Sequence, residues 1–280
     1  MPMPDSASSL RRGLVAAVAG GWIALGCQLE GEPERDIVDI EGLVVATSLM
    51  GSALDARTRE AAADWCAMYA WAISGTRLAR VARELAADAE AVGRWEAEGR
   101  GRVVLRDLAG TARLALRLRA AIGTSSRADI LAILLGSPVS LSVAEIGRRA
   151  RYSKHAVAVA VDAMALAGLV ETSRVGREVR VGVGPDSPVR PWAPRGRREL
   201  VDPIGRWRAA IGVLAVLERT AGLPGGARAV ERRAAVASLL PLAIAGGLPR
   251  VDTGVTGEAF ADEFERWAEA IGREVRPAKG

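Results

Sequence analysis

Hydrophobic residues recur at helical spacing through most of the chain. Apolar positions repeat every three or four residues from 37 to 50 and from 56 to 73, which predicts two helices. The same spacing predicts helices at about 77–87, 103–122, 204–220, 229–245 and 257–271. Alanine, leucine and valine dominate these segments, and aromatic residues make up only 4% of the chain. The pattern therefore predicts a mainly α-helical protein.

The stretch 124–184 contains shorter elements. Apolar residues at helical spacing, behind a serine that can cap a helix, predict a first helix at 127–135. Ser142 and Glu145 have the spacing of a capping box, in which each side chain bonds the backbone amide of the other residue. They begin a second predicted helix, which ends at Ala150.

A third helix follows after a short break. The helical pattern stops at 151–152, and Ser153 is a good N-cap for a helix that continues to about Ala167. Two short helices separated by a turn of a few residues are typical of a helix-turn-helix.

An alternating pattern replaces the helical one after Gly168. Valines occupy alternate positions between 170 and 183, and Gly176 stands where a tight turn would join two strands. A hairpin of this size after a helix-turn-helix is a wing. The stretch 124–184 thus predicts a winged helix-turn-helix with a small β-hairpin.

Basic residues are concentrated in the same part of the chain. Between residues 124 and 198 there are twelve Arg and Lys against six Asp and Glu, a net charge of +6. The whole chain has a formal net charge of +5, so the remainder sums to −1. A basic excess confined to one small module is typical of a surface that binds phosphates.

Helix-turn-helix geometry selects the candidate contacts with double-stranded DNA. The first residues of the third helix enter the major groove, while the end of the second helix and the wing lie near the backbone. The candidate DNA-binding residues are Arg148, Arg149, Arg151, Tyr152, Ser153, Lys154, His155, Arg174, Arg177 and Arg180.

Two sets of residues resemble known families. The segments 152–154, Ala156-Val157 and 167–170, followed by a basic hairpin, resemble bacterial winged-helix regulators of the MarR and ArsR type. This resemblance covers about sixty residues and implies a sequence-specific DNA-binding transcriptional regulator. The segments 31–36, 41–47 and Asp64-Trp65 are similar to a poorly described actinobacterial family of helical proteins that carry such a module.

The third helix also permits a second interpretation. Ala158 and Val159, which should face the groove, have no group that can hydrogen-bond a base edge. They can touch a thymine methyl group, or they can face another protein. A winged helix that serves as a protein-interaction or dimerisation module, in a multi-gene defence or toxin-antitoxin-like system, therefore stays open as the alternative.

The sequence offers little for catalysis, metals or cofactors. It contains no phosphate-binding Walker loop, no nucleophile elbow and no H-E-x-x-H segment. Its two cysteines, Cys27 and Cys66, lie far apart, and His155 is the only histidine. We therefore expect a protein that is not an enzyme and that holds no metal and no cofactor.

The N-terminal segment has some features of a secretion signal. Arg11 and Arg12 precede an apolar run from 13 to 26, which ends at Cys27. Trp22 and the glycines of this run favour instead a helix that packs its apolar side into the core. We expect a cytoplasmic protein without a membrane-spanning helix.

The same patterns divide the chain into five parts and suggest its assembly. The arginines at 77, 80 and 83 favour a solvated helix face over a second DNA-binding helix. Because one module reads few base pairs, we expect the flanking helices to form a homodimer, and a protein partner is also possible. The predicted parts are an N-terminal helical domain at 1–100, a connecting helix at 101–123, the winged helix at 124–184, a proline-rich linker at 185–201 and a C-terminal helical domain at 202–280.

Overall fold

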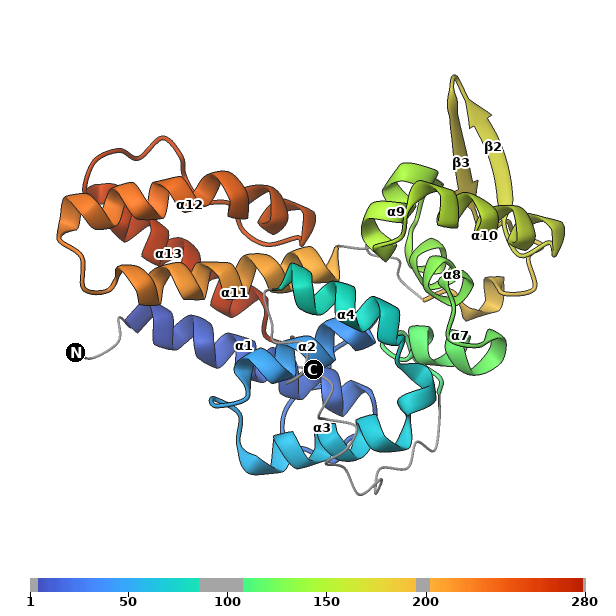
Figure 1. Cartoon of the computed structure of the whole chain (residues 1–280), viewed down its shortest axis with the longest axis horizontal. Coiled ribbons are helices and arrows are strands. Elements are labelled where there is room, and N and C mark those ends of the chain that lie inside the picture. Colours follow the sequence, from blue (N-terminus) through green and yellow to red (C-terminus); the bar gives the residue numbers. More distant parts are fainter. Residues whose placement is uncertain (1–4, 86–107, 195–201, 279–280) are drawn as a thin grey trace.

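The computed structural model describes residues 5–85, 108–194 and 202–278 and is mainly helical (Figure 1). A helical unit occupies one side of the molecule, and a smaller module with a projecting hairpin occupies the other. The helical unit comprises α1 (Asp5–Ala24), α2 (Ile40–Met50), α3 (Ala56–Met68), η1 (Ala70–Ala72), α4 (Gly75–Glu84), α11 (Pro203–Thr220), α12 (Gly225–Ala245) and α13 (Ala259–Glu274). The module comprises α7 (Leu114–Ile122), α8 (Ser126–Gly136), β1 (Leu141–Ser142), α9 (Val143–Ala150), α10 (Lys154–Leu166), β2 (Glu171–Val175), β3 (Glu178–Gly182) and η2 (Arg190–Trp192).

Side-chain caps set the start of several helices. Asp39, Asp55 and Ser74 each accept a hydrogen bond from the backbone amide three residues later, at the starts of α2, α3 and α4. Asp202 does the same for α11, where Pro203 occupies the first turn. These residues satisfy amides that have no partner inside the helix, so each of these four helix starts has a local physical cause.

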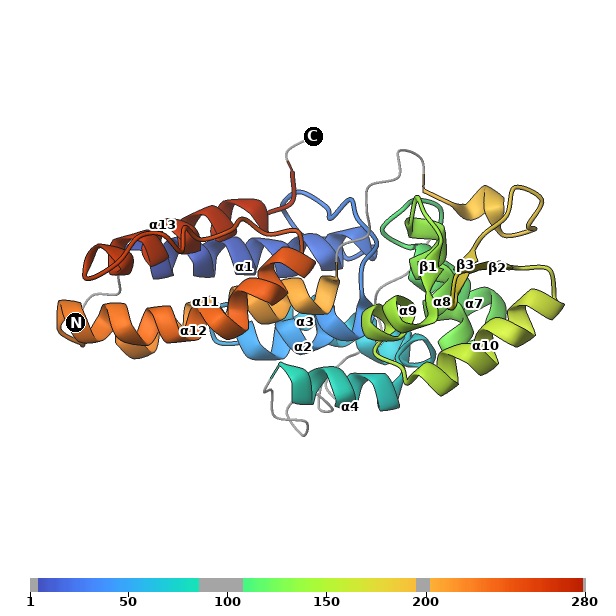
Figure 2. The ribbon, with the colours of Figure 1, turned by 90° about the horizontal axis from the view of Figure 1, so that it is seen from above.

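The two ends of the chain build one hydrophobic core. Figure 2 shows α13 running alongside α1, and buried residues of α1, α2, α3, α11, α12 and α13 belong to one cluster. Leu14, Val18 and Trp22 of α1 are fully buried in it, as expected for a helix with an apolar side in the core. The structure differs here from the predicted separate N- and C-terminal helical domains, because each end covers apolar surface of the other.

The predicted connecting helix is wrong over part of its length. Residues 108–113 are not helical, and the helix begins only at Leu114. Gly110 has a φ of +106°, which is outside the range of a right-handed helix. The amide of Val38 donates to the carbonyl of Ala112 at 3.1 Å, so this segment contacts the helical unit through its backbone. Residues 101–107 of the predicted helix lie outside the described residues.

The module has its own core and a three-stranded antiparallel sheet in the order β1-β3-β2. The hairpin of β2 and β3 is the predicted wing, and Gly176 in its turn has a φ of +61°. The short strand β1 was not predicted; it pairs with β3 through Leu141 and Val181, both buried. The segment after the wing is irregular as far as residue 194, apart from η2, where the Arg117 guanidinium stacks on the Trp192 ring at 4.2 Å.

Among the described residues, no helix is both long enough and apolar enough to cross a membrane.

The closest approach of α1 and α13 depends on two glycines. A Cβ added to Gly13 would lie 2.2 Å from the carbonyl oxygen of Gly272, and a Cβ on Gly272 would lie 2.9 Å from the Cα of Leu10. Side chains at either position would therefore push the two backbones apart.

We expect Gly13→Ala to destabilise the protein by about 1–3 kcal/mol, because overpacking against a backbone atom exceeds the helix-propensity gain of about 1 kcal/mol. Gly75→Ala is the matched control, since no atom lies within 4 Å of its added Cβ. Thermal unfolding followed by circular dichroism would measure both variants. A Gly13→Ala variant as stable as the control would contradict this account of the α1–α13 contact.

Candidate nucleic-acid interface

The turn between α9 and α10 is tight and is closed by backbone contacts. Arg151 ends α9 in the left-handed conformation, with a φ of +61°, and the amides of Arg151 and Tyr152 both donate to the carbonyl of Gly147. A Cβ on Gly147 would lie 2.9 Å from the carbonyl oxygen of Tyr152, so only glycine permits this approach. The Ser153 side chain then accepts from the amide of Ala156 and starts α10 as predicted.

Helix α10 has one buried and one exposed side. Val157, Val161 and Met164 are buried in the core of the module. His155 and Val159 face solvent on the opposite side, and Lys154 is exposed in the first turn. The start of α10 is thus free to approach a ligand, as a recognition helix requires.

The wing arginines do not share one face of the hairpin. Arg174 pairs with Val179 and Arg180 pairs with Ser173, so Arg174 and Arg180 lie on opposite faces. Arg180 donates to the carbonyl of Ser140 at 3.2 Å and thereby ties the wing to the segment before β1. Arg177 lies in the exposed turn at the end of the hairpin.

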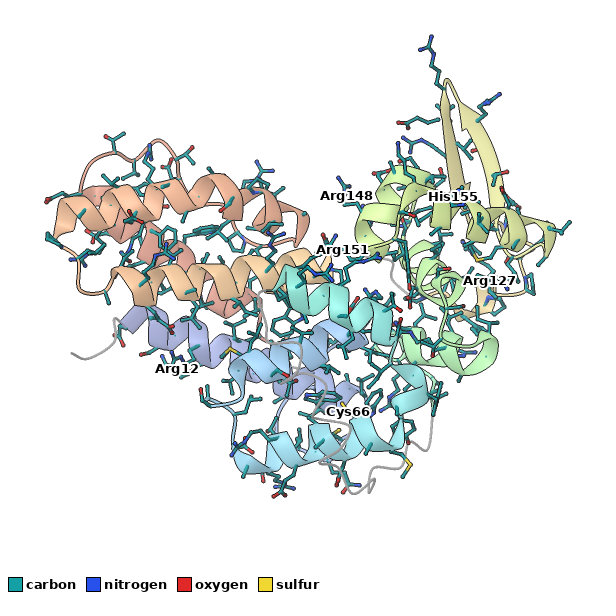
Figure 3. All side chains as sticks on the ribbon, viewed as in Figure 1. Arg12, Cys66, Arg127, Arg148, Arg151 and His155 are labelled. Atoms are coloured by element: carbon teal, nitrogen blue, oxygen red, sulfur yellow. The ribbon has the colours of Figure 1, made fainter. Side chains whose placement is uncertain are left out.

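Four of the predicted basic residues are exposed with unpaired side chains. Among the described residues, none forms a hydrogen bond or ion pair with the side chains of Arg148, Lys154, Arg174 or Arg177. In Figure 3, Arg148 lies on the side of the module nearest α12 and His155 lies nearer the wing. Arg149 is only half exposed and has an interaction of its own.

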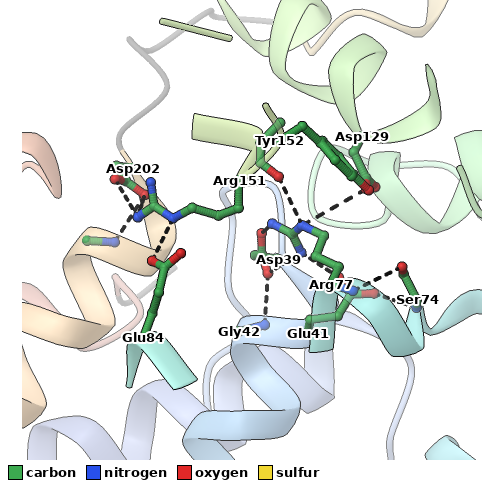
Figure 4. Close-up of polar contacts among 12 residues, drawn as sticks. Asp39, Glu41, Gly42, Ser74, Arg77, Glu84, Asp129, Arg151, Tyr152 and Asp202 are labelled. Carbon is green, nitrogen blue, oxygen red and sulfur yellow. Dashed lines mark hydrogen bonds and ion pairs between the residues drawn. The ribbon is translucent and has the colours of Figure 1, made fainter. Parts of the chain in front are cut away.

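Arg151 faces the helical unit and not solvent. Its guanidinium forms ion pairs of 2.9 Å with Glu84 of α4 and with Asp202, the N-cap of α11 (Figure 4). The side chain is only 10% exposed. In this structure the Arg151 guanidinium is therefore turned away from the surface where the predicted DNA contact would form, because it pairs with both acids. A residue other than glycine is strained in the left-handed conformation that Arg151 adopts. The two ion pairs of its side chain offset that strain.

Tyr152 is also turned inward. Its hydroxyl donates to the Asp129 carboxylate at 2.8 Å, and the Arg80 guanidinium lies 5.9 Å from the ring centre. Burial raises the pKa of the Tyr152 hydroxyl, and the negative charge of Asp129 adds to that effect. The predicted phosphate contact by Tyr152 is therefore not available, since its only donor hydrogen is used inside the protein.

Asp129 belongs to a network of five charged, almost fully buried side chains that joins the module to the helical unit. Figure 4 labels four of them, Asp39, Glu41, Arg77 and Asp129. Arg119 of α7 contacts Glu41 and Asp129, each at 2.7 Å. Arg77 of α4 forms ion pairs with Asp39 and with Glu41. We call Asp39, Glu41, Arg77, Arg119 and Asp129 the charge network.

The charges of this network stabilise one another. Burial alone would raise the pKa of the Glu41 carboxyl, but Arg119 and Arg77 outweigh it and lower that pKa. The pKa of Asp39 is lowered in the same way, mainly by Arg77 against the effect of burial. Both acids therefore stay ionised, as a buried carboxylate between two guanidinium groups should.

Sequence reasoning missed the charge network and misread one of its members. Arg77 was expected on a solvated helix face, yet it is buried, whereas Arg83 is exposed as expected. One signal was available: Asp129 directly precedes the uninterrupted apolar run 130–135 of a predicted helix. A charge in that context indicates a buried partner, although the pattern does not say which one.

No group of three or more His, Cys, Asp and Glu in the described part of the chain could hold a metal ion.

Comparison with known proteins agrees with this geometry. Residues 124–178 match the MarR family, so the resemblance is confirmed for a MarR-like winged helix module that makes up about a fifth of the chain. No curated protein and no solved structure matches the chain.

We expect Glu41→Gln to destabilise the protein by about 3–5 kcal/mol, because it leaves two buried guanidinium groups without their shared carboxylate. Glu30→Gln is the control: it removes the acid of an exposed ion pair, in which Glu30 and Arg57 are 3.7 Å apart. That variant should have nearly the same free energy of unfolding as the original protein. Chemical denaturation would compare them, and equal stabilities would contradict the role given to the charge network.

Proposed function

We propose that this protein binds double-stranded DNA sequence-specifically through its winged helix and acts as a transcriptional regulator. The observation that carries the proposal is a MarR-like module whose recognition helix and wing expose basic side chains that have no partners among the described residues. The net charge of +6 over residues 124–198 supports a polyanionic ligand. A chromosomal ligand also implies a cytoplasmic location, and the proposal includes no catalytic step.

The exposed residues divide into two roles. Lys154 and His155 stand in the first turn of α10, where side chains reach base edges in the major groove. Arg148, Arg174 and Arg177 stand at the end of α9 and on the wing, where the sugar-phosphate backbone would pass. The Ser153 hydroxyl, which caps α10 and is exposed, is free to donate its hydrogen to a phosphate.

Three of the remaining candidates act inside the protein in this proposal. Arg151 and Tyr152 position the recognition helix, because they anchor the turn directly before it to Asp202, Glu84 and Asp129. Arg180 holds the wing against the segment before β1 through its hydrogen bond to the carbonyl of Ser140. Their replacement should therefore affect DNA binding through the geometry of the module and not through lost phosphate contacts.

We expect Arg174→Ala combined with Arg177→Ala to weaken binding to all DNA sequences and to reduce the salt-dependence slope by roughly two, one for each lost phosphate contact. Lys154→Ala with His155→Ala should mainly relax the sequence preference. Fluorescence anisotropy with duplexes at several salt concentrations would measure both effects.

The matched control for the wing variant is Arg219→Ala with Arg250→Ala, two exposed arginines of the helical unit. This control changes the net charge equally but should leave the slope unchanged. An equal loss of slope in both double variants would show a general charge effect and contradict the assigned phosphate contacts.

One observation favours a second candidate function, a protein-interaction module. Val159 and Leu166 of α10 are exposed apolar side chains, and a protein groove would accept them. Salt separates the two functions: binding to DNA weakens steeply as salt rises, whereas an apolar protein contact barely responds. Recovery of a tightly bound protein partner without enriched DNA would favour this alternative.

We propose further that the protein is a homodimer formed by the helical unit. Val230 and Ile244 are exposed on α12, and positions fourteen residues apart lie near the same side of a helix. A two-fold dimer would present two modules to two half-sites, which increases the number of base pairs read.

Sedimentation at micromolar concentration should give a dimer for the original chain and a monomer for Val230→Asp with Ile244→Asp. A monomeric original chain, both with and without DNA, would contradict the dimer. A dimer that survives the double substitution would place its interface elsewhere.

A further inference from the structure

The side of α10 opposite its buried face carries a row of four residues: His155, Val159, Asp162 and Leu166. They are spaced by four, three and four positions, so they lie along one line of the helix surface. Val159 is 56% exposed and Leu166 is 92% exposed. No part of the described protein covers this row.

The charges around the row favour a nucleic-acid ligand over an apolar protein surface. Arg148, Lys154, Arg174 and Arg177 are exposed on the same module, and their side chains have no partners among the described residues. A protein groove that received the row would have to accommodate these cations as well. The phosphates of a duplex are suited to bind them while α10 enters the major groove.

The position along α10 limits which residues of the row reach base edges. With a rise of 1.5 Å per residue, Val159 lies about 6 Å along the helix from His155, and Leu166 lies about 16 Å away. In a helix-turn-helix the N-terminal residues of the recognition helix contact base edges, so the first two turns of α10 can reach them while Leu166 stays outside. Asp162 stands between them, and its negative charge disfavours a close approach of the second half of α10 to phosphates.

Val159 has no hydrogen-bonding group in its side chain, so it can recognise only an apolar feature of a base edge. In the major groove that feature is the C5-methyl group of thymine. Resting on the proposed DNA-binding function, we propose that Val159 is a specificity-determining residue that selects thymine by contact with its methyl group.

The test uses the full-length protein and a duplex that it has selected from a random DNA pool. Each thymine of the selected site is replaced in turn by deoxyuridine, which removes the methyl group and leaves the base pairing and charge unchanged. Binding is measured for the original protein, for Val159→Ala and for Val139→Ala. Val139 is a similarly exposed valine of the module, at 62%, that lies outside the row, in the bend before β1.

We expect at least one position at which deoxyuridine weakens binding of the original protein about fourfold, the value of one buried methyl group. Val139→Ala should keep this penalty, and Val159→Ala should lose it. If the protein selects a site but tolerates deoxyuridine everywhere, or if Val159→Ala keeps the penalty, the inference is overturned while the proposed function stands. If the random pool yields no bound duplex at low salt, the proposed function itself fails, and the inference fails with it.

Discussion

Five buried charges have to remain paired, and this constraint fixes how the winged helix sits on the rest of the protein. The acids of the charge network come from the start of α2 and from α8, and its arginines come from α4 and α7. If these helices moved apart and water did not reach the network, a charge would be left unpaired in a poorly solvated site, at a cost of several kcal/mol. The module is therefore held in one orientation relative to the helical unit and does not move as an independent domain.

The constraint extends to the element that would read DNA. The Tyr152 hydroxyl bonds to Asp129 of the charge network, and the neighbouring Arg151 bonds to acids of α4 and α11. Both residues precede Ser153, where α10 begins. The direction of α10 thus depends on packing far from its own surface. A helical unit that shifts on dimerisation or on binding another molecule would act on α10 through these same contacts.

The helical unit can provide this support because the two ends of the chain close one core. Helices α1 and α13 approach so closely at Gly13 and Gly272 that backbone contacts backbone. Apolar residues of α11 and α12 then complete the core around α1 and α2. Along the sequence, the module lies between the two halves of this unit, α1–α4 and α11–α13.

Local signals were sufficient to predict α8, α9, α10 and the β2–β3 hairpin of the module, but not the short strand β1 or the start of α7. The capping box of Ser142 and Glu145, the Ser153 cap and the turn at Gly176 all act within a few residues, so their effects can be read directly from their spacing. The tertiary structure alone decided which basic residues remain exposed. A helical pattern shows that one side of α4 or of the α9–α10 turn is buried, but it does not show against which element. Arg77, Arg151 and Tyr152 became internal because Glu41, Asp202 and Asp129 approach them from distant parts of the sequence, whereas Lys154, His155 and Val159 remain exposed because no described element approaches that side of α10.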